Sequence, residues 1–125
     1  MSSTPTRATI YEDSGTTCMA RIMGDDASAI TQAGLSSITL NVFKDDSTTA
    51  EITSTVSIST SVFDTYQTDA RWSKDSTGYN FRHQIPFTVM DTGDATYRCE
   101  YKFVPSSGNP WFVVYLIDTV EIRTS

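Results

Sequence analysis

The sequence predicts an all-β fold: an antiparallel β-sandwich with Greek-key connections and about seven or eight strands. Ser and Thr make up 36 of the 125 residues, and Thr with β-branched and aromatic residues is typical of strands. Short runs alternate apolar with polar residues, and turn residues separate them. No run keeps a helical period, so we expect one sandwich domain over residues 1–125, with an N-terminal arm at 1–6. A closed or partly open barrel is the alternative.

In the first half of the chain, alternation predicts three strands, at residues 7–12, 16–23 and 37–43. The Gly-Asp-Asp sequence at 24–26 predicts a turn after the second strand, because these residues tolerate turn conformations. Residues 27–36 show neither a strand period nor a sustained helical one, so we expect a loop there.

The middle of the chain predicts an edge strand followed by a central one. Residues 50–61 place apolar side chains between small polar ones, which favours a half-solvated strand near an edge, and residues 62–66 begin a short strand or corner. The sequence Asp-Ser-Thr-Gly at 75–78 predicts a tight turn into a strand at 79–85, which Pro86 ends because it has no N–H for a ladder. Alternation puts four residues on the inward face of this strand: Tyr79, Phe81, His83 and Ile85.

The last two runs differ in how many of their faces are apolar. Residues 95–103 place aromatic side chains on one face and alternating charges on the other, as in an amphipathic strand. Residues 111–117 are apolar without interruption, and alternation returns at Asp118. A strand that is apolar on both faces needs a cover on both. We expect one face to meet the core and the other to meet a partner subunit or a protruding loop.

Charge and hydropathy argue against two classes of partner. The chain carries 9 basic and 15 acidic residues, with a net charge of −6, whereas nucleic-acid binding requires clustered cations. No window approaches the roughly 18 apolar residues that cross a bilayer, so we expect no membrane partner. The first residues lack the apolar core of a signal peptide, so we expect no export by a classical route.

Few residues in this sequence carry chemistry. His83 is the single histidine, and we interpret it as a packed, hydrogen-bonded side chain. Because no acid and nucleophile accompany it at a recognisable spacing, we expect no enzymatic activity and no cofactor or metal site. Cys18 and Cys99 both fall on inward strand faces. We favour two reduced, buried thiols, and a disulfide between the two sheets is the alternative.

Two further groups of residues have a structural and a functional interpretation. The acidic turns at 25–26, 45–46 and 91–94 lack the ligand spacing of a calcium loop, so we interpret them as solvated turns. Four aromatic residues at alternating positions favour a core role over a sugar-stacking face. They are Trp72, Tyr79, Phe81 and Trp111.

Residues 93–99, Gly-Asp-Ala-Thr-Tyr-Arg-Cys, resemble the tyrosine corner of immunoglobulin-type domains. In that motif a Tyr two residues before the second Cys, here Tyr97, hydrogen-bonds back to the backbone at the strand entry. The Trp expected about a dozen residues after the first Cys is absent, and Leu35 or Ile38 stands in that region. The resemblance covers about a third of the chain and implies an immunoglobulin-like sandwich.

Several short stretches carry a second resemblance, which extends over nearly the whole chain. They are residues 8–14, 30–33, 36–38, 63–64, 67–69, 71–72 and 75–81. In these stretches the chain resembles small β-sandwich proteins encoded among the virion genes of tailed bacteriophages and prophages. This resemblance implies a virion structural protein assembled in the host cytoplasm, in the first place a capsid decoration or cement protein. A neck, tail or baseplate module is the alternative.

The same resemblance implies that the partners are the major capsid protein or other virion subunits, bound in many copies or as a homo-oligomer. The two-faced apolar run and the N-terminal arm are the expected contact regions. The contact residues we expect are Arg7, Trp111, Phe112, Val114 and Leu116. A carbohydrate- or surface-binding sandwich module is the second hypothesis, and it predicts exposed rings with convergent polar side chains.

Overall fold

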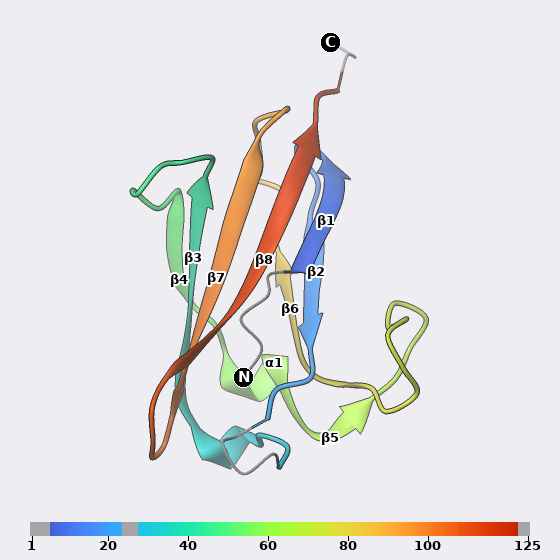
Figure 1. The fold of residues 1–125 in the computed structure, drawn as a ribbon, viewed down its shortest axis with the longest axis vertical. Coiled ribbons are helices and arrows are strands. Elements are labelled where there is room, and N and C mark those ends of the chain that lie inside the picture. The colour runs from blue at the N-terminus through green and yellow to red at the C-terminus, as the bar shows by residue number, and fades with distance from the viewer. Residues whose placement is uncertain (1–5, 24–27, 123–125) are drawn as a thin grey trace.

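The structure, a computed structural model, describes residues 6–23 and 28–122 and consists of two β-sheets packed against each other (Figure 1). It confirms the all-β sandwich, with eight strands in the described residues. The strands are β1 (Thr6–Tyr11), β2 (Thr16–Ala20), β3 (Leu35–Lys44), β4 (Ile52–Thr55), β5 (Val62–Gln67), β6 (Tyr79–Ile85), β7 (Thr96–Pro105) and β8 (Trp111–Val120). A short 3₁₀ turn spans Gln32–Gly34, and one helical turn, α1, spans Ile58–Ser61.

One sheet has five strands in the order β1-β8-β7-β3-β4, and the other has three in the order β2-β6-β5. The expected central strand is therefore β6, which lies between β2 and β5. Thr6, which we expected in the N-terminal arm, begins β1. The rest of that arm, at 1–5, and the expected turn at 24–26 lie outside the described residues.

One strand pair departs from the antiparallel pattern. β1 pairs parallel with β8, from Thr6 opposite Tyr115 to Tyr11 opposite Val120. The chain leaves the five-stranded sheet after β1 and crosses to the other sheet for β2, so β1 meets a strand remote in sequence. Periodicity predicts strands and their faces but not which distant strands pair, so it gave no sign of this parallel edge.

The expected strand over residues 50–61 is wrong beyond Thr55. Val56 is buried, and the chain leaves the sheet there to form α1. Ser57 precedes the helix in an extended conformation. Ser and Thr side chains compete with the backbone for hydrogen bonds, which favours turns over a continuous ladder in this Ser/Thr-rich segment.

The core fills the space between the sheets and is rich in aromatic rings. Phe81 on β6 packs edge-on against Tyr101 and Phe103 of β7, with centroid distances of 5.1 and 5.0 Å. Tyr79 is buried but lies outside this cluster: its ring contacts Phe63 and Trp72 instead. The β5–β6 register shifts between the Val62–Phe81 and Gln67–Tyr79 pairs, and Tyr79 packs there on a ring of β5 and on a ring of the segment between β5 and β6.

The structure bears out two expectations, the tyrosine corner at Tyr97 and a pair of reduced, buried thiols. The backbone N–H of Thr92 donates to the Tyr97 hydroxyl oxygen at 3.1 Å, which is the expected tyrosine corner. Cys18 on β2 and Cys99 on β7 are buried in opposite sheets, and neither is in a disulfide.

The predicted turn at 75–78 is present, and a single carboxylate organises it. Asp75 Oδ1 accepts from the backbone N–H groups of Thr77 and Gly78, each at 3.1 Å. Gly78 has φ +103°, and a Cβ there would lie 2.2 Å from the Gln67 carbonyl oxygen. Only glycine fits this position, because any side chain would collide with the end of β5.

Candidate functional site

A row of apolar side chains lies on the solvent side of β8. We call Phe112, Val114 and Leu116 the outer row. They alternate with residues that pack in or against the core, such as Tyr115 and Ile117, whereas no member of the outer row belongs to the core cluster. Phe112 is 50% exposed, and Val114 and Leu116 are half-buried. The outer row thus occupies the outer face of the five-stranded sheet.

Two further apolar residues continue this face beyond Asp118. Val120 at the end of β8 is 41% exposed, and Tyr11, its register partner on β1, is 63% exposed. Their side chains follow the same alternation as the outer row. The apolar part of the face therefore spans both strands of the parallel pair.

Trp111, the first residue of β8, points to the other side of the sheet. Its indole stacks on Phe103 with centroids 5.4 Å apart and planes 8° apart, and it packs against the core. Its Nε1 is buried and has no hydrogen-bond partner among residues 6–23 and 28–122. Of the expected contact residues, the structure therefore brings Phe112, Val114 and Leu116 together and places Trp111 on the inner side.

Arg7 lies beside the outer row and is held in place by a carboxylate. Its Nε lies 2.8 Å from Asp118 Oδ2, and its Nη2 lies 3.0 Å from Asp118 Oδ1. This two-bond geometry matches the planar guanidinium to the planar carboxylate. Arg7 is also the register partner of Leu116, so its charge stands at the edge of the apolar row.

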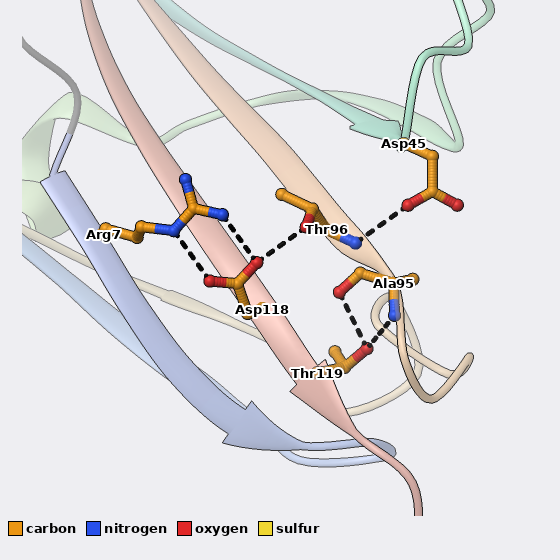
Figure 2. Close-up of polar contacts among 6 residues, drawn as sticks. All are labelled: Arg7, Asp45, Ala95, Thr96, Asp118 and Thr119. Atoms are coloured by element: carbon orange, nitrogen blue, oxygen red, sulfur yellow. Dashed lines mark hydrogen bonds and ion pairs between the residues drawn. The ribbon is translucent and has the colours of Figure 1, made fainter.

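Asp118 joins three strands of the five-stranded sheet (Figure 2). Besides Arg7 of β1, its Oδ1 accepts from the Thr96 hydroxyl of β7 at 2.7 Å. The bond from Thr96, followed by the bond from Arg7, lowers the pKa of Asp118. Thr96 N–H in turn donates to Asp45 Oδ1 at 3.0 Å, which ties the β3–β4 turn to the same network.

At the end of β8, Thr119 lies on the inner side of the sheet and forms hydrogen bonds to the turn before β7. Its hydroxyl donates to the Thr92 carbonyl at 2.6 Å and accepts from the Ala95 N–H at 3.1 Å. Thr119 is buried, so these bonds satisfy a hydroxyl that would otherwise be desolvated without a partner. Asp118 and Thr119 therefore anchor both faces of the end of β8.

A charged row on β7 runs alongside the outer row. Arg98 Nε and Glu100 Oε2 form an ion pair at 2.6 Å, so most of this charge is already compensated within the chain. An apolar centre with a polar border is the usual composition of a protein–protein interface. In the register, Lys102 stands opposite Phe112, Glu100 opposite Val114 and Arg98 opposite Leu116.

Comparisons with protein-family models, with curated proteins and with solved structures find no match.

The histidine and the two cysteines, whose side chains could take part in catalysis, are held in structural contacts. His83 Nδ1 lies 2.8 Å from the Tyr101 hydroxyl oxygen, and desolvation lowers the pKa of the imidazole. Burial raises the pKa of Cys18 to about 11 and that of Cys99 to about 12. Both thiols are therefore protonated at neutral pH, whereas a nucleophilic cysteine needs a thiolate.

The four aromatic residues considered for sugar stacking do not share one exposed face. Phe81 and Tyr79 are buried, and Trp111 stacks on Phe103. Trp72 leans on Tyr79 at 5.6 Å and donates its indole N–H to Asp75 Oδ1 at 3.1 Å. Trp72 and Tyr79 thus pack on each other, whereas Phe81 and Trp111 both pack on Phe103.

Within residues 6–23 and 28–122, no group of three or more His, Cys, Asp or Glu side chains is arranged to hold a metal ion. The same part of the chain has no helix of the length and hydropathy that span a bilayer. Asp45, in one of the acidic turns, has a positive φ of 53° and serves as the acceptor for Thr96.

The sequence interpretation missed Asp118 and Tyr11 as parts of this face. The sequence does contain a signal for Asp118, because it is the first polar residue after the apolar run at 111–117. Because side chains alternate, an outward Asp118 implies that Leu116, Val114 and Phe112 also face outward. No such local signal marks Tyr11, whose place depends on the β1–β8 pairing.

Proposed function

We propose that this protein is a structural protein of a bacteriophage particle, in the first place a capsid decoration protein, which binds other virion subunits through the outer row. The observation that carries the proposal is the apolar outer face of β8. The inner face of the same strand already packs against the core, so the outer row is available to a partner.

Burial of the outer row supplies the driving force. Removing apolar surface from water stabilises a complex by about 25 cal/mol per Å². A single subunit gains little from such a small patch, but the gain is repeated at every copy bound to a shell or tube. The mechanism is therefore cementing: each bound copy shifts the lattice toward its assembled state because it binds that state preferentially.

The charges around the outer row are compatible with docking. Arg7 is paired with Asp118, and Arg98 is paired with Glu100, so a partner would not have to compensate these groups one by one. A buried charge without a partner would oppose binding. Lys102, beside Phe112, has no ion pair among the described residues and would select a partner with an acidic group there.

The assignment to a virion, and to the capsid before the neck or tail, rests on the resemblance of stretches such as 8–14 and 75–81 to phage proteins. The acidic net charge of −6 supports it, because a protein made in many copies must stay soluble before assembly.

The test is retention of the purified protein on isolated particles or tubes of the major structural protein encoded nearby. We expect saturable retention at a fixed stoichiometry, and loss of retention in Phe112→Glu and Leu116→Glu. The matched control is Gln84→Glu, which adds the same charge at an exposed position of the other sheet and should bind normally.

Circular dichroism and thermal unfolding establish that each variant is folded. Folded Phe112→Glu and Leu116→Glu that still bind would overturn the outer row as the contact surface. A folded wild-type chain that ignores the particles but binds glycans would overturn the virion role and favour the carbohydrate-binding module.

A further inference from the structure

Four strands stand at the edges of the two sheets: β1 and β4 in one, β2 and β5 in the other. An edge strand presents unpaired backbone N–H and C=O groups, which pair readily with another strand unless something blocks them. The four edge strands of this sandwich differ in whether something blocks such pairing.

Three of the edges carry an obstruction. On β2, the Met19 carbonyl accepts from the Tyr115 hydroxyl at 2.5 Å. On β5, the Val62 carbonyl accepts from the Gln32 side-chain amide at 2.8 Å, so the loop before β3 covers its start. On β1, the Arg7 guanidinium places a charge on the strand, which is a common protection of edges.

β4 has no comparable protection. Its sequence, Ile-Thr-Ser-Thr, contains no charge and no proline. β3 is its one strand neighbour in the sheet, and Figure 1 shows β4 at the left edge of the sheet, where the loop that joins it to β3 extends further left only at its upper end. Thr53 and Thr55 are exposed. The edge is therefore open along its length.

The register shows which backbone groups of β4 are free. Val56 N–H donates to the Ile38 carbonyl at 2.9 Å, in the same register as the pairing of β4 with β3. Backbone groups of alternate residues point to opposite sides of a strand. Those of Thr53 and Thr55 therefore point away from β3, into solvent.

We propose that β4 pairs antiparallel with β4 of a second copy of this chain, about a two-fold axis at Ser54. Thr53 of each copy then lies opposite Thr55 of the other, and the free N–H and C=O groups of these residues bond reciprocally. The two five-stranded sheets join into one continuous sheet. A two-fold contact of this kind closes on itself and gives a dimer.

The segment is self-complementary in this register. Thr53 opposite Thr55 is a favourable cross-strand pair, and Ile52 falls opposite Val56 of the second copy. The one nearby charge, Glu51, falls opposite Ser57 and not opposite its own copy. A strand of an unrelated protein would not place these matching residues opposite β4. For this reason we take the pairing strand to be β4 of a second copy of this chain.

This dimer is independent of the virion role proposed above. β7 and β3 separate β4 from β8 in the sheet, so the outer row stays accessible when β4 is paired. Each dimer would present two outer rows on one side of the extended sheet.

The test is the mass of the full chain by light scattering over a range of concentrations. We expect a monomer–dimer equilibrium, with the amides of Thr53 and Thr55 protected from hydrogen exchange only at concentrations where the dimer forms. The double variant Thr53→Lys, Thr55→Lys brings like charges face to face across the two-fold axis. It should remain monomeric at concentrations at least about tenfold above those needed by the unaltered chain.

The control for added charge is Gln84→Lys with Thr88→Lys, at two exposed positions away from β4, and it should dimerise normally. A chain that is monomeric at every concentration overturns the pairing. So does a dimer that survives in the folded lysine variant, or one that is abolished by Phe112→Glu, because that result would place the contact on the outer row.

Discussion

His83 Nδ1 lies 2.8 Å from the hydroxyl oxygen of Tyr101, and this contact connects the two sheets. The two rings meet edge to face with centroids 5.5 Å apart. Because desolvation lowers the pKa of His83, the folded protein favours the neutral imidazole. The lone histidine therefore acts as a structural link whose strength depends on pH.

Acidification should destabilise the fold through His83. In the unfolded chain its pKa is about 6.5, and in the folded chain it is lower, so the unfolded state binds more protons below about pH 6.5. The free energy of unfolding should therefore fall between pH 7.5 and 5.5. The measurement is the urea midpoint at both pH values. His83→Gln should flatten this dependence, and an unchanged slope in that variant would contradict the assignment.

Asp118→Asn should loosen β1 selectively. The substitution removes the charge that holds Arg7 and weakens the acceptor for Thr96. We expect faster hydrogen exchange of the β1 amides, with little change in β3 and β7. Because the pKa of Asp118 is lowered in the folded state, the contribution is present at neutral pH and is lost only as the pH falls through that lowered value. Uniform loss of protection over all strands would argue against a local role.

Tyr97→Phe should cost about 1 to 2 kcal/mol of the free energy of unfolding, because Thr92 N–H loses its acceptor. The ring itself is retained, so packing changes little. Tyr66→Phe is the control: this tyrosine is exposed, and we expect a change within about 0.5 kcal/mol. Equal effects of the two substitutions, by chemical denaturation, would show that the tyrosine corner does not stabilise the fold.

Two substitutions on β8 should differ strongly although their positions lie five residues apart. Ile117→Ala opens a cavity in the core and should cost about 2 to 5 kcal/mol, whereas Phe112→Ala on the outer row should cost less than about 1 kcal/mol in the monomer. The measurement is denaturant unfolding of both variants. A large loss for Phe112→Ala would mean that β8 presents its other face to the core.

Cys18 and Cys99 should resist thiol reagents in the folded state. Both are buried, and their raised pKa values of about 11 and about 12 keep them protonated. We expect no reaction with a disulfide-exchanging reagent in native buffer and two equivalents after unfolding. Absence of reaction in the unfolded chain would instead reveal a disulfide.

Sequence predicted the fold well where the deciding contacts are local. The turn at 75–78 depends on Asp75 and Gly78, which lie three positions apart in the chain, and the faces of β7 follow from simple alternation. The parallel pairing of β1 with β8 does not follow from contacts between residues close in the chain. It depends on β1 meeting β8, with Arg7 and Asp118 separated by 111 positions.

The surface was predicted in part, for a related reason. An unbroken apolar run shows that both faces of a strand are apolar, but it does not show which residues belong to which face. Trp111 was therefore grouped with Phe112, although the two point to opposite sides. Asp118 shows which residues of β8 face outward, because it is polar and bonds to Arg7 on the outer side of the sheet.

The parallel alignment of β1 and β8 also determines how the fold bears mechanical load. A force that draws Thr6 and Val120 apart pulls the two strands in opposite directions along their common axis. All six residue pairs of the ladder, together with the Arg7–Asp118 bonds, are then strained at once in shear. In a hairpin pulled open from its end, the bonds would instead break one after another. The terminal strands therefore form a clamp against extension.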